Sequence, residues 1–141
     1  MNSQPRGDRW ADVLAHRPDH QREAITERFR AAGVDADLVH STLADGGDAL
    51  HAAATSAAEG WSRDFGGDLG AALLAAEVST LAAHLVSRAS AIRAVAVESL
   101  LDEYSAVAVA AALGVSRQKV YDIGKGGSST PFITTVPWRQ S

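Results

Sequence analysis

The feature that most constrains the fold is a long stretch without proline, from Asp68 to about Tyr104, in which Gly70 is the one residue that weakens a helix. Its large apolar residues recur at spacings of three, four and seven, and Arg88 is the single polar member of the series. This spacing is typical of a helix with one apolar face. We call the series the apolar stripe: Leu74, Val78, Leu81, Leu85, Ile92 and Val95.

The stretch predicts either one helix about 50 Å long or two helices with a break near residues 87–90. We expect the apolar stripe to lie in the core of a single-chain bundle, and a helix that pairs with a second copy is the alternative. Upstream, apolar spacing and glycine stops predict shorter helices, with Asp19 and Asp48 as N-caps. They cover Arg9–His16, Asp19–Ala32, Asp35–Ala44 and a segment from Asp48 to Trp61 or slightly beyond.

Composition restricts the class of protein. The chain has 141 residues, a formal net charge of −4 and no cysteine, so disulfides and thiolate metal sites are excluded. The N-terminus lacks the pattern of a signal peptide. Polar residues at Glu77, His84, Arg88 and Arg93 interrupt the longest apolar stretch, so we expect no membrane span and a cytoplasmic protein.

No group of residues points to an enzyme. His16 and His20 have the spacing of two ligands on one helix face, but a proline lies between them and no third ligand is near, so we expect no metal. Serine and threonine occur without the local pattern of a nucleophile, and the glycine pairs lack a phosphate-binding signature. We therefore expect neither catalytic residues nor a cofactor. Trp10, Trp61 and Phe65 are candidates for a small-molecule pocket, although such residues more often anchor a core.

The segment from Ala106 to Lys125, AVAVAAALGVSRQKVYDIGK, meets the requirements of two short helices that cross over a tight turn. Ala110 is small enough for close packing, Gly114 tolerates the positive φ of such a turn, and Val120 is placed to point back at the first helix. The expected N-caps and the remaining apolar contacts are Ser105, Ser116, Val109, Leu113, Val115 and Ile123.

In the LGVS-R-Q-x-V-Y arrangement of residues 113–121, this segment resembles the broad helix-turn-helix family of bacterial DNA-binding proteins. The resemblance covers the last quarter of the chain, with residues 92–104 as the supporting helix of a tri-helical domain. It implies that the second helix enters the major groove of double-stranded DNA, with Arg117 on guanine and Gln118 on adenine. The implied contact residues are Ser116, Arg117, Gln118, Lys119, Tyr121, Asp122 and Lys125, of which Ser116, Lys119 and Lys125 suit phosphates.

Asp122 departs from this chemistry, because a carboxylate repels phosphate. It must therefore accept a hydrogen bond from cytosine, pair with a cation or point away from DNA. Charge otherwise favours this end of the chain: from residue 116 onward there are four Lys or Arg and one acid, whereas residues 31–60 carry five acids and no Lys or Arg. A phosphate backbone is best accommodated at the basic end.

The sequence thus predicts an all-α fold in four segments: an N-terminal helical bundle or dimerisation region (1–67), a long helix suited to dimerisation (68–91), a helix-turn-helix domain (92–125) and a flexible, extended arm (126–141). We expect a sequence-specific transcriptional regulator that acts as a homodimer, because one short recognition helix with few cations binds DNA only modestly. The N-terminal helices are candidates for contact with a protein partner. The alternatives are a protein-interaction adaptor that uses the fold without DNA, and an accessory factor in recombination, partition or packaging.

Overall fold

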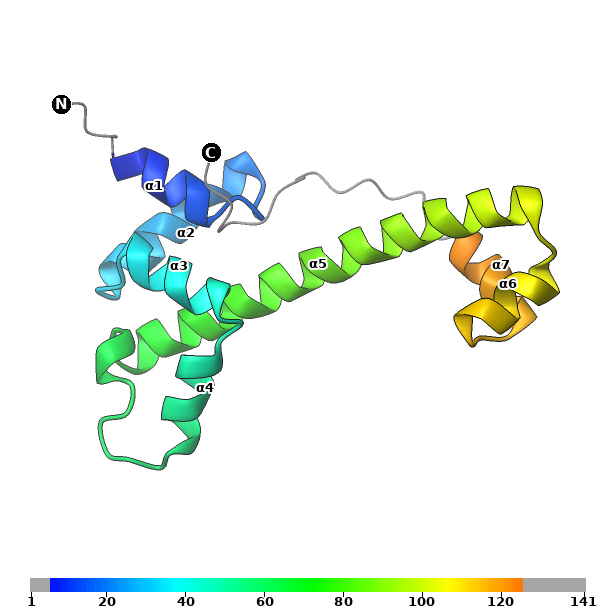
Figure 1. Ribbon diagram of the computed structural model, residues 1–141. Helices are drawn as coiled ribbons and strands as arrows, with labels where there is room; N and C mark the ends of the chain where they lie inside the picture. Colours follow the sequence, from blue (N-terminus) through cyan, green and yellow to red (C-terminus); the bar gives the residue numbers. More distant parts are fainter. Residues whose placement is uncertain (1–5, 126–141) are drawn as a thin grey trace. The chain divides into compact units, whose positions relative to one another are not determined.

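The computed structural model describes residues 6–125, and all regular secondary structure in this range is helical, as the sequence predicts (Figure 1). The predicted flexible link and extended arm of residues 126–141 lie outside the described residues. The helices are α1 (Arg6–Val13), α2 (Asp19–Ala31), α3 (Ala36–Ala44), α4 (Asp48–Thr55), the short 3₁₀ helix η1 (Arg63–Phe65), α5 (Gly67–Glu103), α6 (Ala106–Leu113) and α7 (Arg117–Lys125).

The described residues form two compact units, and the boundary falls inside α5, between Ala82 and Ala83. The N-terminal unit contains α1 to α4, η1 and the first part of α5, and the C-terminal unit contains the rest of α5 with α6 and α7. The sequence left open a break in this helix near residues 87–90. The structure has none there, since α5 is one continuous helix (Figure 1). The predicted segment boundary near residue 91 is a functional division and stays a prediction.

The core of the N-terminal unit takes large apolar side chains from each of its longer elements. Trp10 of α1 stacks on Phe29 of α2, with ring centroids 5.9 Å apart and an interplanar angle of 21°. Stacked rings at this distance stabilise a helix pair beyond the area that they bury. The other large side chains that are fully or almost fully buried here are Val13, Leu14, Val34, Val39, Leu43 and Leu74.

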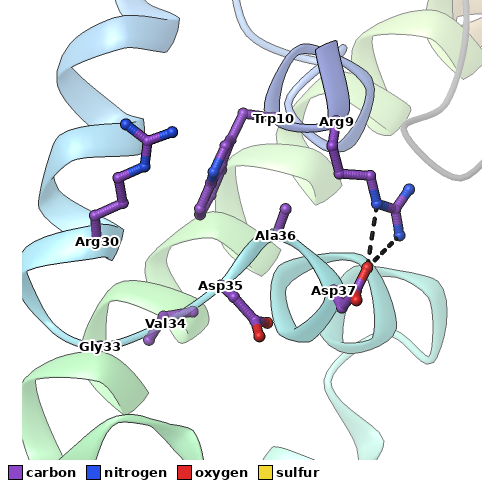
Figure 2. A pocket seen from close by; sticks show the side chains of 8 residues that line it. All are labelled: Arg9, Trp10, Arg30, Gly33, Val34, Asp35, Ala36 and Asp37. Carbon is purple, nitrogen blue, oxygen red and sulfur yellow. Dashed lines mark hydrogen bonds and ion pairs between the residues drawn. The ribbon is translucent and has the colours of Figure 1, made fainter. Parts of the chain in front are cut away.

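Charged side chains surround Trp10 at the rim of this core, where a cavity of about 500 Å³ opens (Figure 2). Arg9 donates to the carboxylate of Asp37 on α3 at 2.9 Å, and the guanidinium of Arg30 lies 5.9 Å from the Trp10 ring centroid. A second cavity of about 500 Å³ includes Trp61 in its lining. Trp10 and Trp61 therefore line separate cavities, and the structure does not join them in one pocket, which was the less favoured alternative for these residues.

A carboxylate of α5 is buried in the N-terminal unit and fully hydrogen-bonded there. Arg17 donates from Nε and Nη2 to the two oxygens of Glu77 at 2.9 and 3.0 Å, and His16 Nε2 lies 2.5 Å from Oε2. Burial alone would raise the pKa of Glu77, but the hydrogen bonds and charges of His16 and Arg17 outweigh it and hold the pKa below its usual value. Glu77 is therefore a buried anion with two partners.

Several predicted caps differ from the observed ones. Asp35, expected only as the start of its helix, is the N-cap of α3, since its carboxylate accepts from the backbone N–H of Leu38 at 2.9 Å. Gly47, and not Asp48, is the N-cap residue of α4, and Asp48 is the first helical residue. The carboxylate of Asp45 accepts from three backbone N–H groups at this end of the helix, between 2.8 and 3.2 Å away. Pro18 occupies the N-cap position of α2, so Asp19 also begins its helix.

The helix α4 is shorter than the alanine content predicts, because it ends at Thr55 and does not reach Trp61. Ala57 adopts the left-handed conformation with φ +61°, and the hydroxyl of Ser56 accepts from the backbone N–H of Ala58, two residues later, at 3.1 Å. Short hydroxyl side chains compete with helical hydrogen bonds in this way. The hydrogen bonds of this serine therefore end the helix despite the high helix propensity of the alanines around it.

The apolar stripe has two different environments. In the N-terminal unit, Leu74 and Leu81 are buried, as expected of a core helix. In the C-terminal unit, Ile92 and Val95 are 66% and 65% exposed, and α5 instead buries Ala94 and Val97 on another side. The expectation that the whole stripe lies in a core is therefore correct for one part and wrong for the other.

By length and composition α5 is apolar enough to cross a bilayer, and it is the one such helix among residues 6–125. This differs from the expectation based on its interrupting polar residues. A core helix passes the same test. Glu77, one of those residues, is buried against Arg17 within the N-terminal unit, which is how a core helix accommodates a carboxylate.

Candidate nucleic-acid interface

The C-terminal unit has a small apolar core to which three helices contribute. Its buried members are Val97 of α5, Val109 and Ala110 of α6, and Val120 and Ile123 of α7, with Leu100, Leu101 and Val115 packed against them. Ala110 and Val120 therefore have the packing roles that the sequence predicts. Leu113 does not, because it is 42% exposed and lies at the end of α6, where the chain turns away.

The connection between α6 and α7 is short and closely determined. Gly114 ends α6 with φ +71°, and the backbone N–H of Val115 donates to the carbonyl of Ala110 at 3.1 Å. Ser105 and Ser116 cap the two helices, with Oγ accepting from the backbone at 3.1 and 3.0 Å. The glycine and both predicted caps are confirmed, and together they fix where α7 begins.

All the predicted contact residues lie on the exposed part of α7 or at its N-cap: Ser116, Arg117, Gln118, Lys119, Tyr121, Asp122 and Lys125. Residues four apart share a helix face, so Arg117, Tyr121 and Lys125 form one row, beside a second row of Gln118 and Asp122. Val120 and Ile123, which are buried, hold the opposite side of α7 in the core. The fold therefore brings the predicted residues together on one helix.

The exposed surface of α7 is positively charged. Arg117, Lys119 and Lys125 outnumber Asp122 by three to one, which leaves a net charge of +2 on this helix. Within residues 6–125, none of the three cations forms an ion pair. The N-terminus of the helix adds the partial positive charge of its dipole beside Ser116. An anion is therefore favoured on this surface by side chains and backbone alike.

A hydrogen bond that the sequence analysis did not identify involves the residue that departs from the expected chemistry. Gln118 Nε2 donates to Asp122 Oδ1 at 3.1 Å. The i, i+4 spacing of a glutamine and an aspartate on a helix was the available signal for it. Asp122 is thus engaged by an amide on its own helix, and the same contact restricts the rotamers of Gln118.

Two further exposed side chains near the motif were also missed. Tyr104, directly after α5, and Val107, at the start of α6, are both more than half exposed. They are three residues apart, across the cap at Ser105. Where exposed apolar residues are neighbours on a surface, another macromolecule can pack against them.

Comparisons of this chain with protein-family models, with curated proteins and with solved structures find no match. The geometry of α6 and α7 and the chemistry of their exposed residues are therefore the basis for a functional conclusion.

Proposed function

We propose that this protein is a sequence-specific DNA-binding transcriptional regulator, that α6 and α7 act as its helix-turn-helix, and that it works as a homodimer in the cytoplasm. The observation that carries the proposal is the division of α7 into two sides. Val120 and Ile123 fix the helix in the core, while the outward surface carries Arg117, Lys119 and Lys125, none of which forms an ion pair within residues 6–125. A helix presented in this way suits the major groove of double-stranded DNA.

Each exposed residue of α7 has a role under this proposal. Arg117 reads guanine through a bidentate hydrogen bond, and Gln118 reads adenine. Tyr121, in the row of Arg117, contacts a base edge or a thymine methyl group. Ser116, Lys119 and Lys125 contact phosphates and set the register of the helix on the duplex.

Asp122 supports base selection in this scheme. While it accepts from Gln118 at 3.1 Å, the carboxylate orients the amide and offsets one cation of the helix. It also repels any phosphate placed near it, which penalises docking in a shifted register. A carboxylate can in addition accept a hydrogen bond from the amino group of cytosine.

Selection of DNA from a random pool, followed by sequencing, tests the proposal directly. We expect enrichment of a sequence with two related half-sites about 34 Å apart, the spacing that a two-fold homodimer requires. Enrichment of a single half-site would remove the homodimer from the proposal. A wild-type chain that selected nothing at low salt would remove DNA binding.

Variants separate base reading from charge. Arg117→Ala and Gln118→Ala should each weaken binding to the selected site by about 1–3 kcal/mol and relax the preference at one base pair. Lys125→Ala should weaken binding to all sequences and lower the slope of log affinity against log salt by about 1. Arg28→Ala is the matched control, because it removes an exposed cation of the N-terminal unit. An equal loss in the control would assign the effect to net charge.

A protein-interaction adaptor is the second candidate, and the exposed pair Tyr104 and Val107 favours it. An apolar contact would survive high salt, whereas a phosphate contact weakens steeply as salt rises. Tyr104→Ser with Val107→Ser would then abolish the interaction, and Arg117→Ala would leave it unchanged. A DNA-binding accessory factor would have the contact chemistry of the regulator, and the positions of its sites relative to promoters would distinguish the two.

A further inference from the structure

The part of α5 in the C-terminal unit has two opposite sides. Val97 and Ala94 are buried, and Val97 belongs to the core that α6 and α7 share. Val95 is two residues from Val97, which places it on the opposite side of the helix. Its side chain is 65% exposed. Ile92 lies on the same side as Val95 and is 66% exposed. One side of this helix is therefore covered within the unit, and the other presents branched apolar residues to solvent.

The exposed side continues the spacing of the apolar stripe through this unit. Alternating steps of three and four lead from Leu85 and Arg88, which are half-buried, through the exposed Ile92 and Val95 to the exposed Ser99. This is the spacing at which one helix packs along another in a left-handed pair. Alanines flank the series at positions 89, 91 and 96, and such small residues allow two helix backbones to approach closely. We call this surface the α5 seam, defined by Leu85, Arg88, Ile92, Val95 and Ser99.

The charges on the α5 seam are complementary to those of a second, antiparallel copy. When Ile92 of one copy packs against Val95 of the other, the same register places Arg88 opposite Ser99. Glu98 and Asp102, which lie one residue before and three after Ser99, then flank that arginine on the partner helix. Within residues 6–125, none of these charged residues forms an ion pair in its own chain.

A parallel pair would have the opposite electrostatics. Each Arg88 would face the Arg88 of the other copy in a shared layer, and each Asp102 would face its equivalent. Like charges opposed across a helix pair destabilise it, and charges at such positions select partner and orientation. In the antiparallel arrangement the same residues form two equivalent clusters, each with the arginine of one copy beside the acids of the other. The two-fold axis of a closed dimer relates the two clusters.

We propose that the α5 seam is the homodimer interface, in which two copies of the chain pair antiparallel along the C-terminal part of α5. This inference deepens the proposed function, which requires a homodimer, and it is tested without DNA. The occupant of the exposed side is a second copy, because the seam supplies both the apolar layer and the opposite charges that it needs. Each copy keeps α6 and α7 on the side of α5 that faces away from the partner helix.

The mass of the full chain in solution, from sedimentation equilibrium over a range of concentrations, gives the first test. Wild type should form a dimer, and Ile92→Glu should raise the dimer dissociation constant at least about tenfold, because a carboxylate would be buried without a partner. Val86→Glu is the matched control: Val86 is also 65% exposed on α5, but it lies nine residues from Val95 and so on the opposite side. A monomeric wild type, or equal losses in both variants, would overturn the interface.

Charge reversal keeps the test independent of folding. Arg88→Glu alone should weaken the dimer, since it places three acids together in each cluster. Combining Arg88→Glu with Glu98→Arg and Asp102→Arg restores opposite charges and should recover the dimer. If the combined variant stayed monomeric while its circular dichroism matched that of wild type, the proposed pairing would be wrong.

The absence of native cysteine makes the orientation testable by oxidation. In the antiparallel dimer the two Ser99 residues lie about 16 Å apart along the helices, too far for a disulfide. Ser99→Cys alone should therefore not cross-link. A mixture of Ser99→Cys and Arg88→Cys chains should cross-link, because the register places these two positions opposite each other. The mixed dimer still forms, since it keeps one of the two charge clusters. Efficient cross-linking of Ser99→Cys with itself would establish a parallel pair and overturn the antiparallel one. If the wild-type chain formed the antiparallel dimer but bound no DNA, the proposed function would be wrong and the interface would stand.

Discussion

The two parts of α5 continue one apolar pattern but bury different sides. In the N-terminal unit, Leu74 and Leu81 of the stripe are buried, and Glu77 beside them is buried against His16 and Arg17. In the C-terminal unit, α6 and α7 cover Val97, and the stripe is left exposed at Ile92. The same spacing therefore belongs to a core in one unit and to a surface in the other.

This difference shows what hydrophobic periodicity does and does not determine. Spacing fixes which side chains share a face, because the helix repeat is constant. It does not fix which neighbour covers that face, since the neighbour comes from other segments of the chain or from another chain. The second part of α5 has apolar residues on more than one side, and α6 occupies only one of them.

The largest effect that tests this comparison is a truncation at matched positions of the stripe. Leu74 is fully buried, so Leu74→Ala should lower the free energy of unfolding by about 2–5 kcal/mol through lost burial and the cavity left behind. Ile92→Ala, at a 66% exposed position, should lower the stability of the unit by less than about 0.5 kcal/mol. Urea denaturation of each variant, followed by far-ultraviolet circular dichroism, measures the difference.

Protein concentration supplies the control for that pair. The cost of Ile92→Ala should grow at concentrations where wild type is a dimer, because truncation then removes interface contacts. The cost of Leu74→Ala should not depend on concentration. Equal and concentration-independent losses at both positions would show that the two parts of α5 have the same kind of environment, and the comparison would fail.

A smaller effect should come from the buried carboxylate of the N-terminal unit. Glu77→Gln keeps the shape of the side chain but removes the charge beside Arg17 and His16, and it should lower stability by about 1–3 kcal/mol at neutral pH. Hydrogen exchange resolved along the chain would locate this loss in the N-terminal unit. A loss that extended equally to α6 and α7 would contradict a role of Glu77 in the N-terminal unit alone.

The pH dependence of stability follows from the lowered pKa of Glu77. The unfolded chain takes up a proton near the ordinary value of 4.5, and the folded chain does so only at lower pH, so the stabilising contribution is complete above 4.5. It is lost as the pH falls from there through the folded pKa. Glu77→Gln should remove this part of the acid destabilisation. The experiment compares urea midpoints of the two chains between pH 7 and pH 3, and parallel curves would argue against a buried ion.

The sequence predicts the C-terminal motif well because its signals are local. Gly114 and the caps at Ser105 and Ser116 act on backbone groups within four residues, so their effects do not depend on the rest of the fold. The exposure of the α7 residues follows in turn from the buried positions of Val120 and Ile123, whose spacing is visible in the sequence. DNA binding itself stays a prediction from the resemblance and the charge.

Features that depend on distant segments were not predictable in the same way. Glu77 and Arg17 are sixty residues apart in sequence, and nothing local pairs them. Gly70 looks like a weak point of α5, yet a Cβ there would lie 2.1 Å from the carbonyl oxygen of Phe65, so the close approach of that loop requires glycine. The exposure of Ile92 depends likewise on which side α6 and α7 cover.

The smallest effect concerns the cap that begins α7. Ser116 Oγ accepts from the backbone N–H of Lys119 at 3.0 Å, so Ser116→Ala should lower the stability of the C-terminal unit by about 1 kcal/mol. Asp35→Ala removes the equivalent cap of α3 and should affect the N-terminal unit alone. Hydrogen exchange of the two variants would show whether each loss stays within its own unit.

Replacing the same serine by aspartate separates the structural role of the cap from its proposed contact with DNA. Ser116→Asp retains a capping oxygen and adds a negative charge at the N-terminus of α7, where it suits the helix dipole, so the unit should be as stable as wild type. The same charge would repel a phosphate bound there, and affinity for every DNA sequence should fall. Unchanged DNA affinity in a stable Ser116→Asp chain would mean that the N-terminus of α7 does not face the DNA backbone, and α7 would then have to dock in another orientation or bind a different partner.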